Sequence, residues 1–217
     1  MISPIDPQKY LQTSEIIDWQ NPEILELARQ LALACQTTEE TAKACFEWVR
    51  DRIHHSWDYQ MNPVTCRASD VLKYRTGYCF AKSHLLAALL RANQIPAGLC
   101  YQRLTIDNPP IQESIDTNSP CTLHGLNAVL LPEFGWYRID ARGNKDGVNA
   151  QFIPPQEQLA FEIKTLPEAD FPDILAEPLP IVVAALQQSH TWQDVLLCLP
   201  DISPEMWLKS HSSCQID

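Results

Sequence analysis

Three residues far apart in the chain, Cys79, His124 and Asp140, have side chains that could together perform nucleophilic catalysis. A thiolate is a nucleophile, an imidazole can take up and return its proton, and a carboxylate can orient the imidazole. In cysteine enzymes the nucleophile and its base are distant in sequence and meet only in the fold. The elements around the three residues therefore decide whether they could act together.

Cys79 stands between a turn that contains Gly77 and a strongly apolar helix that we predict over residues 79–93. The first amides of a helix have no intrahelical partner, and its N-terminus carries partial positive charge. Both effects favour thiolate over thiol, and the same amides can stabilise an oxyanion. Gly77 allows a sharp turn and a close approach of substrate. The alternative interpretation is a buried cysteine near a helix start.

His124 begins an apolar strand that we predict over 123–131, and Asp140 ends the next predicted strand, 136–141. Because a tight turn joins the two strands, antiparallel pairing brings His124 close to Asp140. The other histidines have less suitable places: at the end of a predicted helix, on the Cys79 helix pointing away from the thiol, or in the tail. These are His54, His55, His84, His190 and His211. Taken alone, His124 could be structural, but the three signals converge on one geometry.

The remaining pattern predicts helices first and a sheet afterwards. The predicted helices cover residues 22–35, 38–53 and 68–74, a further strand covers 97–104, and two tail helices cover 181–189 and 192–199. This order indicates an α+β fold with a mostly antiparallel sheet. We expect a single domain over 1–217, with a core region at about 40–142 and a C-terminal extension at about 165–217 that packs on it. The polar stretch 105–122 is a candidate substrate-binding loop or lid, or else a solvated connection.

Composition excludes several classes of protein. The formal net charge of −11 argues against nucleic acid as a partner. The first ten residues lack a secretory pattern, and the apolar stretch 179–186 is too short to span a bilayer, so we expect a cytoplasmic protein without a membrane partner. The eight cysteines form no Cys-x-x-Cys pair, which argues against a zinc ribbon or a thioredoxin-type motif. We expect no cofactor and no metal, and the oligomeric state stays open.

Three segments resemble the motifs of the transglutaminase-like superfamily. Residues 77–97 resemble its Gly-x-Cys, apolar helix and Leu-Arg-x-x-Gly-Ile-Pro-Ala sequence, residues 124–129 resemble its His-Ala-Trp-Asn-Glu-Val strand, and residues 135–140 resemble its Gly-Trp-x-x-x-Asp strand. The resemblance covers about residues 40–142. It implies a papain-like transglutaminase core of N-terminal helices and a nucleophile helix packed on an antiparallel sheet. It also implies Cys79 as nucleophile, His124 as base, Asp140 as orienter and a thioacyl-enzyme.

The chain departs from the family pattern at four positions that could reshape the acyl pocket: Gln94 for Gly, Gly125 for Ala, Leu126 for Trp and Ala128 for Glu. None of them removes a member of the triad.

The family also has a side-chain oxyanion donor upstream of the cysteine. Trp57 is our candidate for that role, with Tyr59 or Gln60 behind it, and plain packing is the alternative for each.

The resemblance implies thiol-dependent acyl transfer on amide or peptide bonds, by a compact, bacterial-looking cysteine peptidase, amidase or transglutaminase-like enzyme. Its substrate would be a peptide, a protein or a small amide, and hydrolysis is slightly preferred. The competing hypothesis is a catalytically inactive peptide- or protein-binding module on the same fold. A zinc site using Cys79 and His124 lacks the further ligands that such a site needs.

Overall fold

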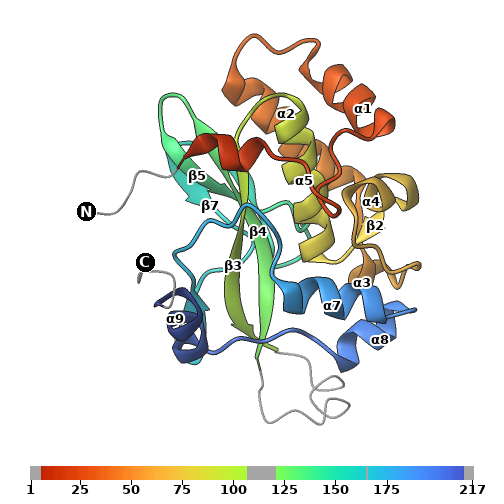
Figure 1. Cartoon of the computed structure of the whole chain (residues 1–217), viewed down its shortest axis with the longest axis vertical. Coiled ribbons are helices and arrows are strands. Elements are labelled where there is room, and N and C mark those ends of the chain that lie inside the picture. Colours follow the sequence, from red (N-terminus) through yellow and green to blue (C-terminus); the bar gives the residue numbers. More distant parts are fainter. Residues whose placement is uncertain (1–5, 107–120, 165, 213–217) are drawn as a thin grey trace.

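The computed structural model describes residues 6–106, 121–164 and 166–212. At its centre lies a four-stranded antiparallel sheet in the order β5-β4-β3-β8. Its strands are β3 (Ala97–Thr105), β4 (Cys121–Leu131), β5 (Gly135–Ile139) and β8 (Ala169–Asp170). The α-helices of the N-terminal half gather on one side of this sheet (Figure 1). The α+β class predicted from the sequence is confirmed.

The N-terminal helices begin where their capping residues predict. They are a short 3-10 helix η1 (Pro7–Leu11), α1 (Pro22–Ala32), α2 (Thr38–Arg52) and α4 (Ala68–Tyr74). The Asn21 side chain caps α1, and the Thr37 hydroxyl accepts from the Glu40 amide at the start of α2. Helix α1 ends three residues before its predicted end because the chain is already turning into α2, where the Gln36 amide donates to the Glu40 carboxylate.

Helix α5 (Cys79–Ala92) is the central helix of the molecule, and every residue from Cys79 to Arg91 is buried. It packs on the sheet and on α1, α2 and α4 (Figure 1). Asn127 on β4 donates to the Ser83 carbonyl of α5 and to the Gly98 carbonyl of β3, which ties helix and sheet together. At the far end of α5, the buried Arg91 guanidinium donates to three carbonyls from separate segments: Gln12, Ala97 and Ala176.

Between α2 and α5 the structure contains three elements that the sequence did not predict. Strand β1 (His54–His55) pairs in parallel with β2 (Thr76–Gly77), and α3 (Ser56–Tyr59) follows β1 directly. The prediction that the two histidines end a helix is wrong, since α2 stops at Arg52. The buried Lys82 ammonium of α5 donates to the Arg50 and Ile53 carbonyls and so satisfies the end of α2.

The C-terminal part wraps around the sheet. It contains the hairpin β6 (Gln151–Ile153) and β7 (Gln156–Gln158) and the helices α7 (Pro180–Gln188), α8 (Trp192–Leu197) and α9 (Pro204–Ser212). The two predicted tail helices are thus confirmed to within two residues at each end, whereas the hairpin and α9 were not predicted. The extension contacts β3 through a bridge between Leu99 and Leu175, and β4 through a hydrogen bond from the Leu123 amide to the Pro200 carbonyl.

The candidate loop 105–122 falls mostly on residues 107–120, which lie outside the described residues, so its role stays a prediction. Among the described helices, none combines the length and the apolar character needed to cross a bilayer.

Candidate active site

Cys79 is the first residue of α5, as predicted, and it is 8% exposed. The residue before it, Tyr78, is the N-cap and gives no side-chain hydrogen bond to the helix start. The first amides of α5 are therefore not satisfied by a capping side chain, and they lie at the end of the helix that carries the thiol. The Tyr78 hydroxyl donates instead to the Trp192 carbonyl of α8, which anchors the turn before the helix.

Strand β4 runs very close to the beginning of α5. A Cβ atom built on Gly125 would lie 2.8 Å from Cδ1 and 3.1 Å from Cα of Phe80, the residue after Cys79. Glycine at this position thus permits the close approach of the strand that carries His124 to the helix that carries the thiol.

His124 and Asp140 form a buried pair. The His124 Nε2 and the Asp140 Oδ2 are 2.7 Å apart, and the two residues are 4% and 1% exposed. The register of the sheet explains the contact, because Ile139, the last residue of β5, lies opposite Asn127 of β4, and Asp140 follows it directly. Backbone amides hold the carboxylate in place: Arg142 donates to Oδ1 and Ala160 to Oδ2. The predicted proximity of His124 and Asp140 is thus what the structure shows.

The surroundings of His124 favour the protonated, positively charged form of its imidazole. Burial lowers the pKa of His124, but the negative charge of Asp140, the Cys79 thiol and hydrogen bonds with both outweigh it, so the pKa is raised above its ordinary value. Burial alone would raise the pKa of Asp140. The His124 charge and three hydrogen bonds together outweigh burial and lower this pKa below its ordinary value, so the carboxyl stays ionised. With Nε2 held by Asp140, Nδ1 is the ring nitrogen that remains for the Cys79 thiol.

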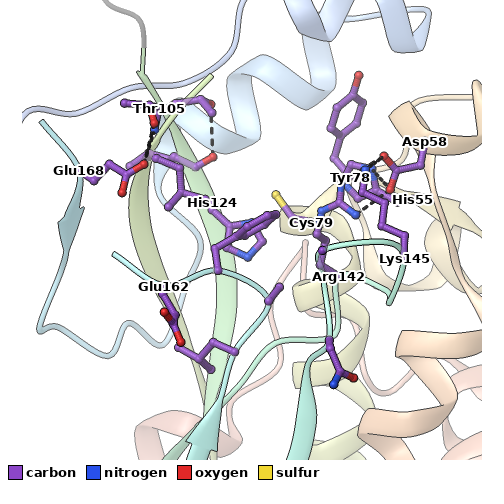
Figure 2. A pocket seen from close by; sticks show the side chains of 18 of the residues that line it. His55, Asp58, Tyr78, Cys79, Thr105, His124, Arg142, Lys145, Glu162 and Glu168 are labelled. Carbon is purple, nitrogen blue, oxygen red and sulfur yellow. Dashed lines mark hydrogen bonds and ion pairs between the residues drawn. The ribbon is translucent and has the colours of Figure 1, made fainter. Parts of the chain in front are cut away.

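Cys79 and His124 open onto a cleft of about 850 Å³. In Figure 2, Cys79 lies between His124 on one side and a group of His55, Asp58, Arg142 and Lys145 on the other. The face of the His124 ring is covered by Phe161, whose ring meets it edge to face with centroids 5.0 Å apart. The two candidate reactive groups are thus nearly buried, and both line the cleft.

A family model described as Transglutaminase-like superfamily matches residues 25–141, more than half of the chain. The chain belongs to the transglutaminase-like superfamily. The matched region contains all three predicted triad residues and begins earlier than the resemblance seen in the sequence.

Solved structures of other proteins are similar to part of this chain. They include a candidate cysteine protease from Cytophaga hutchinsonii, with 18% identity and a TM-score of 0.49, over 65% of this chain and 43% of that one. The periplasmic domain of TgpA from Pseudomonas aeruginosa, bound to ethylmercury, matches with 22% identity and a TM-score of 0.46, over 64% of this chain and 50% of that one. The chain therefore spans half or less of the length of these structures. Among curated proteins, no significant match is found.

The ionic cluster opposite His124 was missed by sequence reasoning. The Asp58 carboxylate accepts from both terminal nitrogens of Arg142, at 2.6 and 3.1 Å, and from Lys145 Nζ at 2.7 Å. The Arg142 guanidinium also lies 5.6 Å from the centroid of the Phe161 ring. The only sequence signal was the position of Arg142, two residues after the predicted orienter. The cluster joins α3 to the segment that follows β5 at the cleft.

The three candidates for the side-chain oxyanion donor lie in different places in the structure. Trp57 lines the cleft, whereas Tyr59 is 61% exposed, packs against the His54 ring and does not line it. Gln60 ends α3 in a left-handed conformation and does not line the cleft either. The structure therefore leaves Trp57 as the one of these three candidates that lies at the cleft.

The structure also shows where the four residues that depart from the superfamily pattern lie. None of them lines the cleft, so an effect on the acyl pocket would have to pass through a neighbouring residue, and it stays a prediction. Leu126 and Ala128 belong to a small separate apolar cluster, Gly125 faces Phe80, and Gln94 adopts a positive φ just after α5, where glycine is usual.

His84 does point away from the thiol, as predicted. Its Nδ1 lies 2.8 Å from the Cys66 carbonyl oxygen. Among the described residues no group of three or more histidine, cysteine or carboxylate side chains could hold a metal ion.

Proposed function

We propose that this protein transfers acyl groups from amide or peptide bonds through a thioester on Cys79, with His124 as base and Asp140 as orienter. The observation that carries the proposal is the buried, hydrogen-bonded pair of His124 and Asp140, with His124 and Cys79 lining the same cleft. The raised pKa of His124 and the uncapped start of α5 both favour a thiolate–imidazolium pair.

The reaction would run in two steps. The Cys79 thiolate attacks the carbonyl carbon, a carbon–sulfur bond forms, and the oxygen becomes an oxyanion near the first amides of α5. The oxyanion then collapses, the carbon–nitrogen bond breaks, and the leaving amine takes the proton from His124. In the second step His124 accepts a proton from water, the hydroxide attacks the thioester, and a carboxylic acid leaves as the thiolate returns.

An amine in place of water would give a transferase. We favour hydrolysis, as we expected from the sequence, with a peptide or small amide as substrate. We propose the cytoplasm as the location. The volume of the cleft falls in the range of sites that bind small molecules and peptide segments.

The proposal is tested by iodoacetamide labelling across pH 4 to 9, with the labelled cysteine identified by mass spectrometry. An ordinary thiol has a pKa of about 8.5 and reacts slowly at pH 6. Burial raises the pKa of Cys45, Cys66 and Cys100 to about 12, which suppresses their reaction further. We expect Cys79 to be labelled first at pH 6.

The matched controls are His124→Ala, which should abolish the selective reaction, and Cys79→Ala, which should remove the labelled site. The more exposed Cys35 and Cys198 serve as internal references in the same sample. If Cys79 reacts no faster than these two at pH 6, the enzyme hypothesis fails and a binding module on the superfamily fold becomes the leading explanation.

A further inference from the structure

A second histidine lies beside the nucleophile. The two-residue parallel ladder pairs His55 with Gly77, so His55 is fixed next to the turn that leads into Cys79. The His55 ring meets the Tyr78 ring edge to face, with centroids 5.5 Å apart, and lines the same cleft as Cys79. Figure 2 shows it on the side of the thiol away from His124. Two imidazoles therefore flank the sulfur.

The His55 ring is buried without the hydrogen bonds that burial normally demands. The residue is 5% exposed, and within the described part of the chain its Nδ1 has no hydrogen-bond partner. The nearest charged oxygen, Asp58 Oδ2, is 3.7 Å away, too far for a hydrogen bond. An unsatisfied buried polar atom costs about 1–3 kcal/mol. Nδ1 is itself buried, so the other ring nitrogen, Nε2, is the one that could meet a substrate atom in the cleft that His55 lines.

The charges around His55 suit a donor rather than a base. Burial lowers the pKa of His55 well below its ordinary value, and Arg142 lowers it further than Asp58 raises it, so the ring is neutral. Asp58 itself is held by two cations, Arg142 and Lys145, and the three side chains together leave one positive charge. A positive field on this side of the thiol stabilises negative charge that develops on a bound carbonyl oxygen.

We propose that His55 is a side-chain oxyanion donor of the active site, giving a hydrogen bond from Nε2–H to the substrate oxygen as Cys79 attacks. The inference rests on the proposed function and names a further residue in it. His124 is held by Asp140 and serves the thiol, whereas His55 serves the oxygen across the cleft.

His55 fits this role better than Trp57, the candidate from the sequence. Its backbone is paired directly to the Gly77 turn, while Trp57 lies in the short helix α3 after the ladder. An oxyanion donor must be held in place before the reaction, because its value lies in needing no reorganisation. The ladder and the Tyr78 contact provide that restraint for His55.

The test compares two reactions of the same sulfur. Acylation by p-nitrophenyl acetate passes through an oxyanion, while alkylation by iodoacetamide displaces iodide at a saturated carbon and forms none. The burst of p-nitrophenolate gives the acylation rate, and mass spectrometry confirms acetyl-Cys79. The variants are His55→Phe, which keeps a ring against Tyr78, His55→Gln, which keeps an N–H donor, and Trp57→Phe, which removes only the indole N–H.

We expect His55→Phe to slow acylation by about 100-fold, the loss typical of one oxyanion donor, with alkylation unchanged within about twofold. His55→Gln should recover part of the acylation rate, and it carries the test if His55→Phe does not fold. Equal losses in both reactions, or no loss of acylation, would overturn the assignment, as would a selective loss in Trp57→Phe alone. If the unmodified protein never forms acetyl-Cys79, the proposed function itself fails and the assignment falls with it.

Discussion

Replacing Gly125 by alanine tests whether the contact between β4 and α5 sets the geometry of the site. The new Cβ would lie 2.8 Å from Phe80 Cδ1, 3.1 Å from Phe80 Cα and 3.3 Å from Phe80 N. Carbon atoms in contact normally stay about 3.5–4.0 Å apart. The Phe80 ring can turn away, but its backbone cannot, so strand and helix must separate by about 0.4 Å to relieve the contact with Cα.

Overpacking of this kind costs about 1–3 kcal/mol of unfolding free energy. The same movement draws His124 away from Cys79, and because a shift of about 1 Å can cost 100-fold in rate, we expect about a tenfold slower reaction here. Urea unfolding gives the first quantity, and iodoacetamide labelling of Cys79 at pH 6 gives the second.

Gly98→Ala is the matched control. Its Cβ would lie 2.3 Å from Ile174 Cγ2 and 3.1 Å from Tyr10 Cδ1, away from the cleft. We expect it to lower stability without slowing the labelling of Cys79. If Gly125→Ala is as stable as the original protein and its Cys79 is labelled at the original rate, the strand and helix have spare room and the reasoning is refuted.

Three further predictions concern the fold around the site. Burial lowers the pKa of His84 to about 4, so the unfolded chain takes up its proton at a higher pH than the folded one. The free energy of unfolding should therefore fall between pH 6.5 and pH 4.5. Urea unfolding should show that His84→Gln loses about 2–3 kcal/mol less of this free energy over that window than the original protein; an equal loss would contradict the burial argument. Gln94 has φ +58°, so Gln94→Gly should raise the unfolding free energy by about 0.5–1 kcal/mol, and a lower melting temperature would count against this. Asn127→Ala leaves the Ser83 and Gly98 carbonyls without their donor and should cost about 2–4 kcal/mol by urea unfolding; an unchanged midpoint would show that water replaces the amide.

The parts of the site that the sequence could predict are those fixed by local pattern. Gly77 and the apolar run after Cys79 predict a helix start, and α5 begins at Cys79. The tight turn between β4 and β5 leaves antiparallel pairing as the simplest arrangement, which is why the pair of His124 and Asp140 followed from spacing.

His55 could not be found in the same way. Its place depends on a two-residue ladder to Gly77, which lies 22 positions away and has no periodicity of its own. Helix α2 ends at Arg52, three residues before His55. From the sequence alone, an extension of this helix by a few residues was enough to account for His55.

The hairpin of β6 and β7 escaped prediction for a related reason. Its strands have three residues each, and β7 consists of Gln156, Glu157 and Gln158, without the alternation of apolar and polar residues that indicates a strand. The hairpin forms through tertiary contacts instead, as when Arg138 pairs with Glu157 and the Tyr137 hydroxyl donates to the Gln156 carbonyl.

The cleft is built from two parts of the sequence, one inside and one after the region that matches the superfamily. The residues proposed to react lie within the region that matches the superfamily, which ends at residue 141. More than half of the residues that line the cleft come after that point, from Arg142 to Glu168 and at Leu199. Substitutions in this later segment that spare the residues in contact with Asp140, His124 and Asp58 could therefore alter which molecules fit while the reacting groups stay in place, so two chains with one chemistry could evolve to serve different substrates.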